Sequence, residues 1–285
     1  MFEIGLSTYA KTIDENLFSQ YREAGISAME IAQPYDKIAS INYEEISSLS
    51  KKYGVRLNSF HLPFAPFDTV DISNPSAQEG TIEYHTSLIK KAAAIGIDKF
   101  IIHPSAEPIK AEKRRERMDC AKLSLSRLAE IADREGAVLC VEDLPRTCLG
   151  RNSEEIAELV SVDERLKLCL DTNHLLSEAL PDYIRKFGKK IVTLHVSDYD
   201  FLNERHWIPG EGDIDWQGVV SALKEVGYEG PWLYEVGFER PDTLIADRPL
   251  NCQDIARNAK QIFAGEKPTA VAKRKPDLEK WVEQF

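Results

Sequence analysis

Short apolar runs alternate with longer segments of helical spacing along almost the whole chain. The predicted strands are Phe2–Ser7, Ala28–Ala32, Val55–Leu62, Lys99–His103, Ala137–Glu142, Leu166–Asp171, Ile191–Val196 and Trp232–Val236. The predicted helices are Glu15–Ala24, Tyr43–Tyr53, Gln78–Ile95, Arg114–Arg134, Ser153–Val160, Leu175–Phe187, Gln217–Val226 and Asn251–Phe263. Eight strands that alternate with eight helices predict a closed parallel barrel. We therefore predict an α/β fold, a single-domain (β/α)8 TIM barrel over residues 1–264, with 265–285 as a short C-terminal extension.

The predicted strands are almost continuously apolar, as in Lys99–Ile102 and Ala137–Val141. Strands of a parallel sheet are covered on both faces, which favours such runs. An open doubly wound sheet is the alternative, but no Gly-x-Gly-x-x-Gly pattern follows the first strand. In the extension, Asp277–Phe285 has the spacing of one short amphipathic helix, although a tail that packs outside the barrel or frays is the preferred interpretation.

The charge and the cysteines limit the partners and the location of the protein. The formal net charge of -11 repels phosphodiester backbones, so nucleic acid is not an expected partner. No window reaches the ~18 apolar residues of a membrane helix, and residues 1–20 lack the apolar core of a signal peptide. The five cysteines show no Cys-x-x-Cys pairing. We expect a cytoplasmic protein with reduced cysteines.

Titratable side chains stand where the later predicted strands end. These residues are Glu142, Asp171, His195 and Glu235, and His174 shares the turn that follows Asp171. In a barrel of this kind the carboxyl ends of the strands meet at one mouth, where the active site lies. Four such groups would face one another as unpaired charges unless a cation lay between them. The pattern therefore predicts a divalent metal site.

Five runs around these strand ends resemble one known group of proteins, the xylose isomerase-like barrel superfamily. The runs are Val141–Asp143, Leu170–His174, Leu194–Asp198, Pro209–Trp216 and Tyr234–Val236. Sugar (phosphate) isomerases and epimerases belong to this superfamily, and so do the type IV AP endonucleases. The resemblance covers most of residues 1–264.

For the ketose 3-epimerase branch, the resemblance implies specific roles. A divalent ion would be held by Glu142, Asp171, His195 and Glu235, and the two glutamates would double as the acid/base pair. The implied function is a metal-dependent sugar or sugar phosphate isomerase/epimerase that transfers a proton through a metal-stabilised enediolate. The chemistry is consistent, because a Lewis acid stabilises the enediolate and two flanking carboxylates can alternate as base and acid. Isomerisation and epimerisation share this intermediate, so both remain open.

Further residues near the mouth are expected to bind substrate. They are His61, His103, His174, Arg205 and His206. A lone histidine is more often a core residue, but His61 and His103 stand at matching levels of the barrel. His206 occupies the position where ketose epimerases often carry a substrate-binding arginine, and Arg205 is adjacent.

Two further features each allow two interpretations, and a third is expected to lie outside the site. Asp198 either holds His195 in one tautomer or caps a loop. Gly210–Gly212 either cradles a phosphate or forms a tight turn. His85 lies mid-helix among charged neighbours and is expected at the surface.

A second function fits the same residues. Nine of them resemble the ligands of the trinuclear zinc site in type IV AP endonucleases: His61, His103, Glu142, Asp171, His174, His195, Glu204, His206 and Glu235. Glu204 stands where that family has Asp. His61, His103, His174, Glu204 and His206 would then hold additional metal, in a zinc-dependent phosphodiesterase. The acidic charge and the lack of an Arg-rich loop after the first two strands favour the isomerase/epimerase. A non-catalytic sugar-binding barrel is the third alternative.

The expected cofactor is one divalent metal ion. A carboxylate-rich set with one histidine favours Mn²⁺, Mg²⁺ or Co²⁺, whereas added histidine ligands favour Zn²⁺. The expected partner is a small-molecule sugar or sugar phosphate, and no association with a membrane is expected. Barrels of this kind often pair, so a homodimer is an expectation that the residues themselves leave open.

Overall fold

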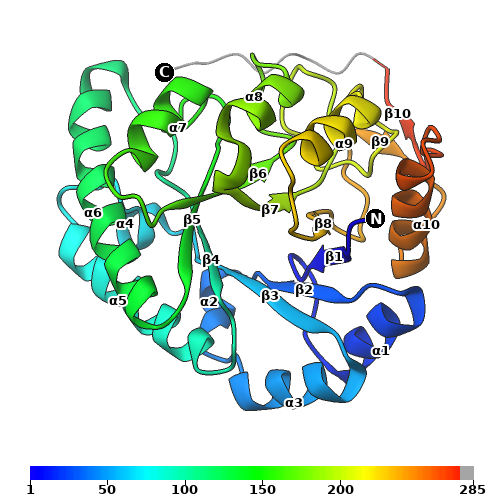
Figure 1. Ribbon diagram of the computed structural model, residues 1–285, viewed down its shortest axis with the longest axis horizontal. Helices are drawn as coiled ribbons and strands as arrows, with labels where there is room; N and C mark the ends of the chain where they lie inside the picture. Colours follow the sequence, from blue (N-terminus) through cyan, green and yellow to red (C-terminus); the bar gives the residue numbers. More distant parts are fainter. Residues whose placement is uncertain (277–285) are drawn as a thin grey trace.

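Eight parallel strands form a nearly closed barrel in the computed structural model, which describes residues 1–276 (Figure 1). The strands are β1 Ile4–Ser7, β2 Ala28–Ile31, β3 Arg56–His61, β4 Lys99–Ile102, β5 Val138–Glu142, β6 Lys167–Asp171, β7 Ile191–His195 and β8 Trp232–Tyr234. Their order is β7-β6-β5-β4-β3-β2-β1-β8. A bridge between Val196 and Tyr234 joins β7 to β8. The predicted (β/α)8 barrel is confirmed.

The helices lie outside the barrel strands (Figure 1). They are α1 Glu15–Ala24, α2 Tyr35–Ile38, α3 Tyr43–Tyr53, α4 Phe67–Val70, α5 Gln78–Ala93, α6 Arg114–Arg134, α7 Ser153–Val160, α8 Leu180–Phe187, α9 Trp216–Glu225 and α10 Cys252–Phe263. Short 3₁₀ turns cover Ala111–Lys113 and Gly188–Lys190. All eight predicted helices are present, although α8 begins later than expected. The short α2 and α4 follow β2 and β3 and were not predicted. None of the helices in residues 1–276 has the length and apolarity needed to cross a membrane.

Local signals explain where the helices begin and end. The side chain of Asp14 accepts a hydrogen bond from Leu17 N at 2.8 Å and so caps α1. Gly25 ends that helix with a φ of 82°, which a side chain would make costly. Asn251 and Asp254 form a reciprocal capping box at the start of α10.

The side chains on the two faces of the sheet differ: one face packs against the helices, and the other points into the barrel, where the site lies. Along β5, Leu139 and Val141 belong to the main apolar core, which packs against the helices. Cys140 lies in a separate small cluster with Ile101 and Cys169. Because side chains alternate along a strand, Glu142 shares the inner face with Cys140. The acidic strand ends therefore point into the barrel mouth.

His85 is buried, which contradicts the expectation of a surface histidine. Its side chain is 0% exposed, and its Nε2 lies 3.0 Å from the carbonyl oxygen of Val70. The reason is the unpredicted helix α4 and the turn after it, which cover this face of α5. Thr81 Oγ1 also donates to Thr69 O at 2.9 Å and holds the two segments together.

Residues 266–276 of the extension run over the loop that follows β7. The short strands β9 Leu244–Ile245 and β10 Lys273–Arg274 pair antiparallel beside this loop. The Oε1 atom of Glu211 accepts hydrogen bonds from Val271 N at 3.2 Å and Ala272 N at 2.8 Å. The division into 1–264 and 265–285 stays a prediction, and the predicted helix at Asp277–Phe285 lies outside the described residues.

Candidate active site

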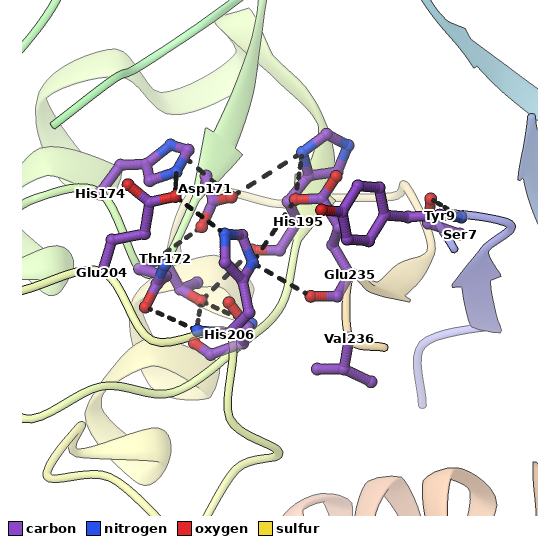
Figure 2. Close-up of polar contacts among 12 residues, drawn as sticks. Ser7, Tyr9, Asp171, Thr172, His174, His195, Glu204, His206, Glu235 and Val236 are labelled. Carbon is purple, nitrogen blue, oxygen red and sulfur yellow. Dashed lines mark hydrogen bonds and ion pairs between the residues drawn. The ribbon is translucent and has the colours of Figure 1, made fainter. Parts of the chain in front are cut away.

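Four predicted ligands lie together at the barrel mouth. One ligand atom each of Glu142, Asp171, His195 and Glu235 lies within 4.8 Å of the other three, and all four side chains are buried. They come from the ends of β5, β6 and β7 and from the residue after β8. Figure 2 shows Asp171, His195 and Glu235 converging from these separate strands. The arrangement supplies three carboxylates and one imidazole to a single centre.

His195 sits in the middle of this group, with a carboxylate on each side of its ring. Its Nδ1 lies 3.1 Å from Glu142 Oε1 and 3.4 Å from Glu235 Oε2. Its Nε2 lies 3.1 Å from Oε2 of Glu30, which comes from β2. Sequence reasoning missed Glu30. An acidic residue inside the apolar run Ala28–Ile31 was the signal that could have found it.

Asp171 is held by backbone contacts on one side only. Its Oδ1 accepts a hydrogen bond from Asn173 N at 2.7 Å, and its own backbone N donates to Asp143 Oδ1 at 2.9 Å. Its Oδ2 is buried without a hydrogen-bond partner among the described residues and faces Nδ1 of His195 at 3.9 Å. A buried carboxylate oxygen with an open position fits a cation ligand.

Without a cation, the buried carboxylates of this group repel one another and are hard to ionise together. Burial and the nearby Glu235 and Glu142 raise the pKa of Asp171 well above its usual range. Burial opposes ionisation of Glu142 as well, but His195 and His103 outweigh it and hold the pKa of that carboxyl well below normal. A divalent cation would stabilise all three carboxylates in the charged form. The donor set therefore fits the predicted metal.

His61 and His103 approach Glu142 from the other side. The Nε2 atoms of the two histidines lie 3.2 Å and 3.3 Å from Glu142 Oε2. Burial alone would lower the pKa of His61, but Glu142 and the other acids raise it to about 9. The structure thus brings both predicted histidines to the site, where they form a second group of potential ligands with Glu142.

His174, Glu204 and His206 form a third such group. The Nε2 of His206 lies 3.1 Å from Glu204 Oε1, and His174 Nδ1 lies 2.8 Å from the carbonyl oxygen of Asp143. Glu204 also forms an ion pair with Arg146 at 2.6 Å, which was not foreseen. Figure 2 shows this group beside Asp171. Five of the six histidines of the chain therefore lie at the mouth.

Arg205 and Asp198 have well-defined partners in the loop after β7. The Nε of Arg205 donates to Asp200 Oδ2 at 3.0 Å, and its guanidinium lies over the ring of Trp207. Its substrate-binding role stays a prediction. Asp198 accepts hydrogen bonds from Gly210 N and from Trp216 Nε1 at 2.8 and 3.0 Å. These contacts support the loop-cap interpretation of Asp198.

A cavity of about 470 Å³ adjoins the centre on the side of β1 to β3. Its lining residues are Tyr9, Ala32, Gln33, Pro34, Tyr35, Asp36, His61, Leu62, Pro63, Phe64, Ala65, Pro66 and Glu235. Tyr9 was not predicted as a site residue, yet its ring extends from β1 toward Glu235 (Figure 2). The lining includes Asp36 and Glu235 but no lysine or arginine among the described residues. The cavity has the size and concave form of a small-molecule site.

Comparison with known proteins supports the same group of enzymes. A family model described as xylose isomerase-like TIM barrel matches residues 18–255. An uncharacterised protein of Methanocaldococcus jannaschii is 25% identical over 90% of this chain and 97% of its own. The D-psicose 3-epimerase of Ruminiclostridium cellulolyticum is 24% identical over 82% of each chain. The inosose isomerase of Bacillus licheniformis is 26% identical over 63% of this chain and 66% of its own.

Solved structures show the same fold. A D-tagatose 3-epimerase-like protein has a TM-score of 0.74 at 22% identity, covering 92% of this chain and 96% of the other. An L-ribulose 3-epimerase has a TM-score of 0.73 at 20% identity, covering 93% and 94%. The solved structures support the fold, whereas the D-psicose 3-epimerase and the inosose isomerase found by sequence similarity support the prediction of an isomerase or epimerase.

Proposed function

Because this chain belongs to the xylose isomerase-like TIM barrel family, we propose that it is a metal-dependent sugar isomerase or epimerase. One observation carries the proposal. Glu142 and Glu235 both approach Nδ1 of His195, at 3.1 and 3.4 Å, and Glu235 also lines the 470 Å³ cavity. Glu235 therefore borders the space in which a sugar would be held, and Glu142 faces the same imidazole nitrogen as Glu235 does.

Glu142, Asp171, His195 and Glu235 would hold the metal. A bound divalent cation supplies Lewis-acid polarisation of the substrate carbonyl. The carboxylate-rich set favours Mn²⁺, Mg²⁺ or Co²⁺, and coordination by the further histidines would favour Zn²⁺. We retain the expectations of a cytoplasmic enzyme and of a homodimer as proposals.

The two glutamates transfer the proton. One of them takes a proton from the carbon next to the carbonyl, and the other returns a proton to the opposite face in an epimerase. In an isomerase, the proton is returned to the neighbouring carbon instead. In this proposal His61, His103, His174 and His206 orient substrate hydroxyls. The apolar cavity side keeps bulk water away from the reacting carbon.

Proton exchange in deuterated water tests the proposal directly. The protein is incubated with Mn²⁺ and a panel of ketoses, ketose phosphates and inososes, and loss of carbon-bound proton signals is followed by NMR. We expect exchange and a new sugar isomer with the wild type and neither with Glu235→Gln. If no member of the panel exchanges a proton although metal is bound, the proposed activity is wrong.

A metal-dependent phosphodiesterase is the second candidate, favoured by the further groups of potential ligands beside the four-residue centre, among them His61 and His103 with Glu142, and His174 and His206 with Glu204. Such a site would take two or three zinc ions. Elemental analysis of protein purified without chelators separates the candidates, because we expect one ion per chain for the isomerase or epimerase. Three zinc ions together with cleavage of abasic-site DNA would establish the phosphodiesterase instead.

A further inference from the structure

Glu30 is a buried carboxylate to which the proposed mechanism gives no part. It lies on β2 with an exposed fraction of 0%, and its Oε2 accepts a hydrogen bond from Ser59 Oγ at 2.8 Å. The same oxygen lies 3.1 Å from Nε2 of His195, across the barrel. Its Oε1 is buried without a hydrogen-bond partner among residues 1–276. A carboxylate kept in such surroundings costs stability that an apolar side chain would not.

The ring of His195 needs different protonation at its two nitrogens to act as a ligand. Nδ1 faces Glu142, Glu235 and Asp171 and must present a lone pair to a metal. Nε2 must then carry the proton, and the only role open to a carboxylate at 3.1 Å from it is that of acceptor.

We propose that Glu30 is a positioning residue that fixes His195 as the Nε2–H tautomer and so directs Nδ1 at the metal. The inference rests on the proposed function, because it presumes a metal at the four-residue centre. A carboxylate behind a metal-binding histidine fixes the orientation of the ring and increases its basicity. Such partners change metal affinity by about 10- to 100-fold.

A hydrogen-bond chain holds Glu30 in place for this role. Asn58 Nδ2 donates to Ser59 Oγ at 3.2 Å, and Ser59 Oγ donates to Glu30. Asn58 Nδ2 also lies 3.4 Å from Thr193 Oγ1, two residues before His195 on β7. The chain therefore connects β2 and β3 to the strand that carries the ligand, which fixes the distance between Glu30 and the ring.

Metal titration of the full-length protein tests this role. Metal-stripped wild type, Glu30→Ala, Glu30→Gln and the control Asp254→Ala are titrated with Mn²⁺ by calorimetry. Asp254 is buried in the capping box of α10, where it pairs with Arg248 and Arg257 and contacts none of the proposed ligands, so its variant reports a loss of stability alone. We expect Glu30→Ala to weaken Mn²⁺ binding 10- to 100-fold. Glu30→Gln should lose less, because the amide oxygen still accepts the Nε2–H, and Asp254→Ala should bind as the wild type does.

The tautomer is read independently from ¹⁵N-labelled histidine in Zn²⁺-loaded protein. The wild type and Glu30→Gln should show His195 protonated at Nε2. Unchanged Mn²⁺ affinity in Glu30→Ala, or a proton on Nδ1 in the wild type, would overturn the role of Glu30. Absence of any metal binding by the wild type overturns the metal centre and this role together. Metal binding without sugar turnover contradicts the proposed function only.

Discussion

The Nδ1 atom of His195 lies 3.1 Å from Oε1 of Glu142, and both side chains are almost completely buried. The other oxygen of Glu142 faces His61 and His103. Glu142 therefore belongs to three groups of potential metal ligands: one with His61 and His103, one with Cys169 and His195, and one with Asp171, His195 and Glu235. Its two oxygens connect the predicted metal centre to the histidines that line the mouth.

Glu235→Gln should abolish turnover and leave the fold intact. The amide keeps the size of the carboxyl group but cannot accept the proton from the substrate carbon, so we expect kcat to fall by about 10²–10⁴-fold. Proton exchange in deuterated water gives the rate, and circular dichroism confirms the fold. The matched control is Glu239→Gln, an exposed glutamate four residues on. Full activity of Glu235→Gln would refute the acid/base assignment.

Asp171→Asn should have opposite effects on the metal-free and the metal-loaded protein. Burial, Glu235 and Glu142 raise the pKa of Asp171, so its charge is unfavourable without a cation. We expect the metal-free variant to be as stable as the metal-free wild type or more stable, by about 1 kcal/mol. Mn²⁺ should stabilise the wild type by about 3 kcal/mol at 100 times its Kd and the variant much less.

Urea unfolding of both proteins, with and without Mn²⁺, measures these four free energies. An equal gain from Mn²⁺ in wild type and variant would show that Asp171 is not a ligand.

The cavity should favour a sugar without a phosphate group. Phosphate is recognised by arginine, lysine or backbone N–H groups, whereas the described lining is mainly apolar and contains two acidic residues. We expect kcat/KM for a free ketose to exceed that for its terminal phosphate by at least about tenfold, since like-charge contacts cost several kcal/mol. A phosphorylated substrate that is turned over faster than the free sugar would contradict this expectation.

The fold and the meeting of Glu142, Asp171, His195 and Glu235 at the mouth could be predicted because both depend on local pattern. Glu142, Asp171 and His195 each end an apolar strand, so they meet at the mouth of the barrel whatever path the loops take. The contact of Glu30 with His195 spans 165 residues, and no local pattern encodes which buried acid meets which histidine. The contact of Arg205 with Asp200 depends on the path of the loop after β7, which the sequence pattern does not specify.

His85 shows a second limit of the sequence pattern. Its charged neighbours on α5 suggested that the side chain is exposed to solvent, but residues 67–71 pack over it and bury it. Coverage by a separate segment is not visible in the periodicity of the helix itself.

Glu211→Gln should loosen the extension over the mouth-side loop. The buried carboxylate accepts two backbone hydrogen bonds, from Val271 and Ala272, and forms an ion pair with Arg240. The neutral amide leaves the buried Arg240 without its charged partner, so we expect the free energy of unfolding to fall by about 1–3 kcal/mol. Urea unfolding measures it, with Glu239→Gln as the exposed control. Hydrogen exchange at Val271 and Ala272 should accelerate, and unchanged protection there would rule out this anchoring role.

His85 should make the protein less stable in mild acid. Burial lowers its pKa to about 4 in the folded protein, against an ordinary value of 6.5. Above pH 6.5 the ring is neutral in both states and pH has no effect. Between pH 6.5 and 4 only the unfolded chain takes up the proton, so the free energy of unfolding falls as the pH falls, by about 3 kcal/mol in total. Below pH 4 both states are protonated and the loss is complete.

Comparison with His85→Gln isolates this contribution from that of the carboxylates. The glutamine amide can still donate to the carbonyl oxygen of Val70, which His85 Nε2 contacts at 3.0 Å, but it does not titrate. We therefore expect the stability of the variant to decline less than that of the wild type between pH 7 and pH 4, by about 3 kcal/mol. Ser87→Ala, at an exposed position of α5, should follow the wild type throughout. Parallel pH profiles for wild type and His85→Gln would mean that folding leaves the pKa of His85 at its ordinary value, and that burial does not lower it.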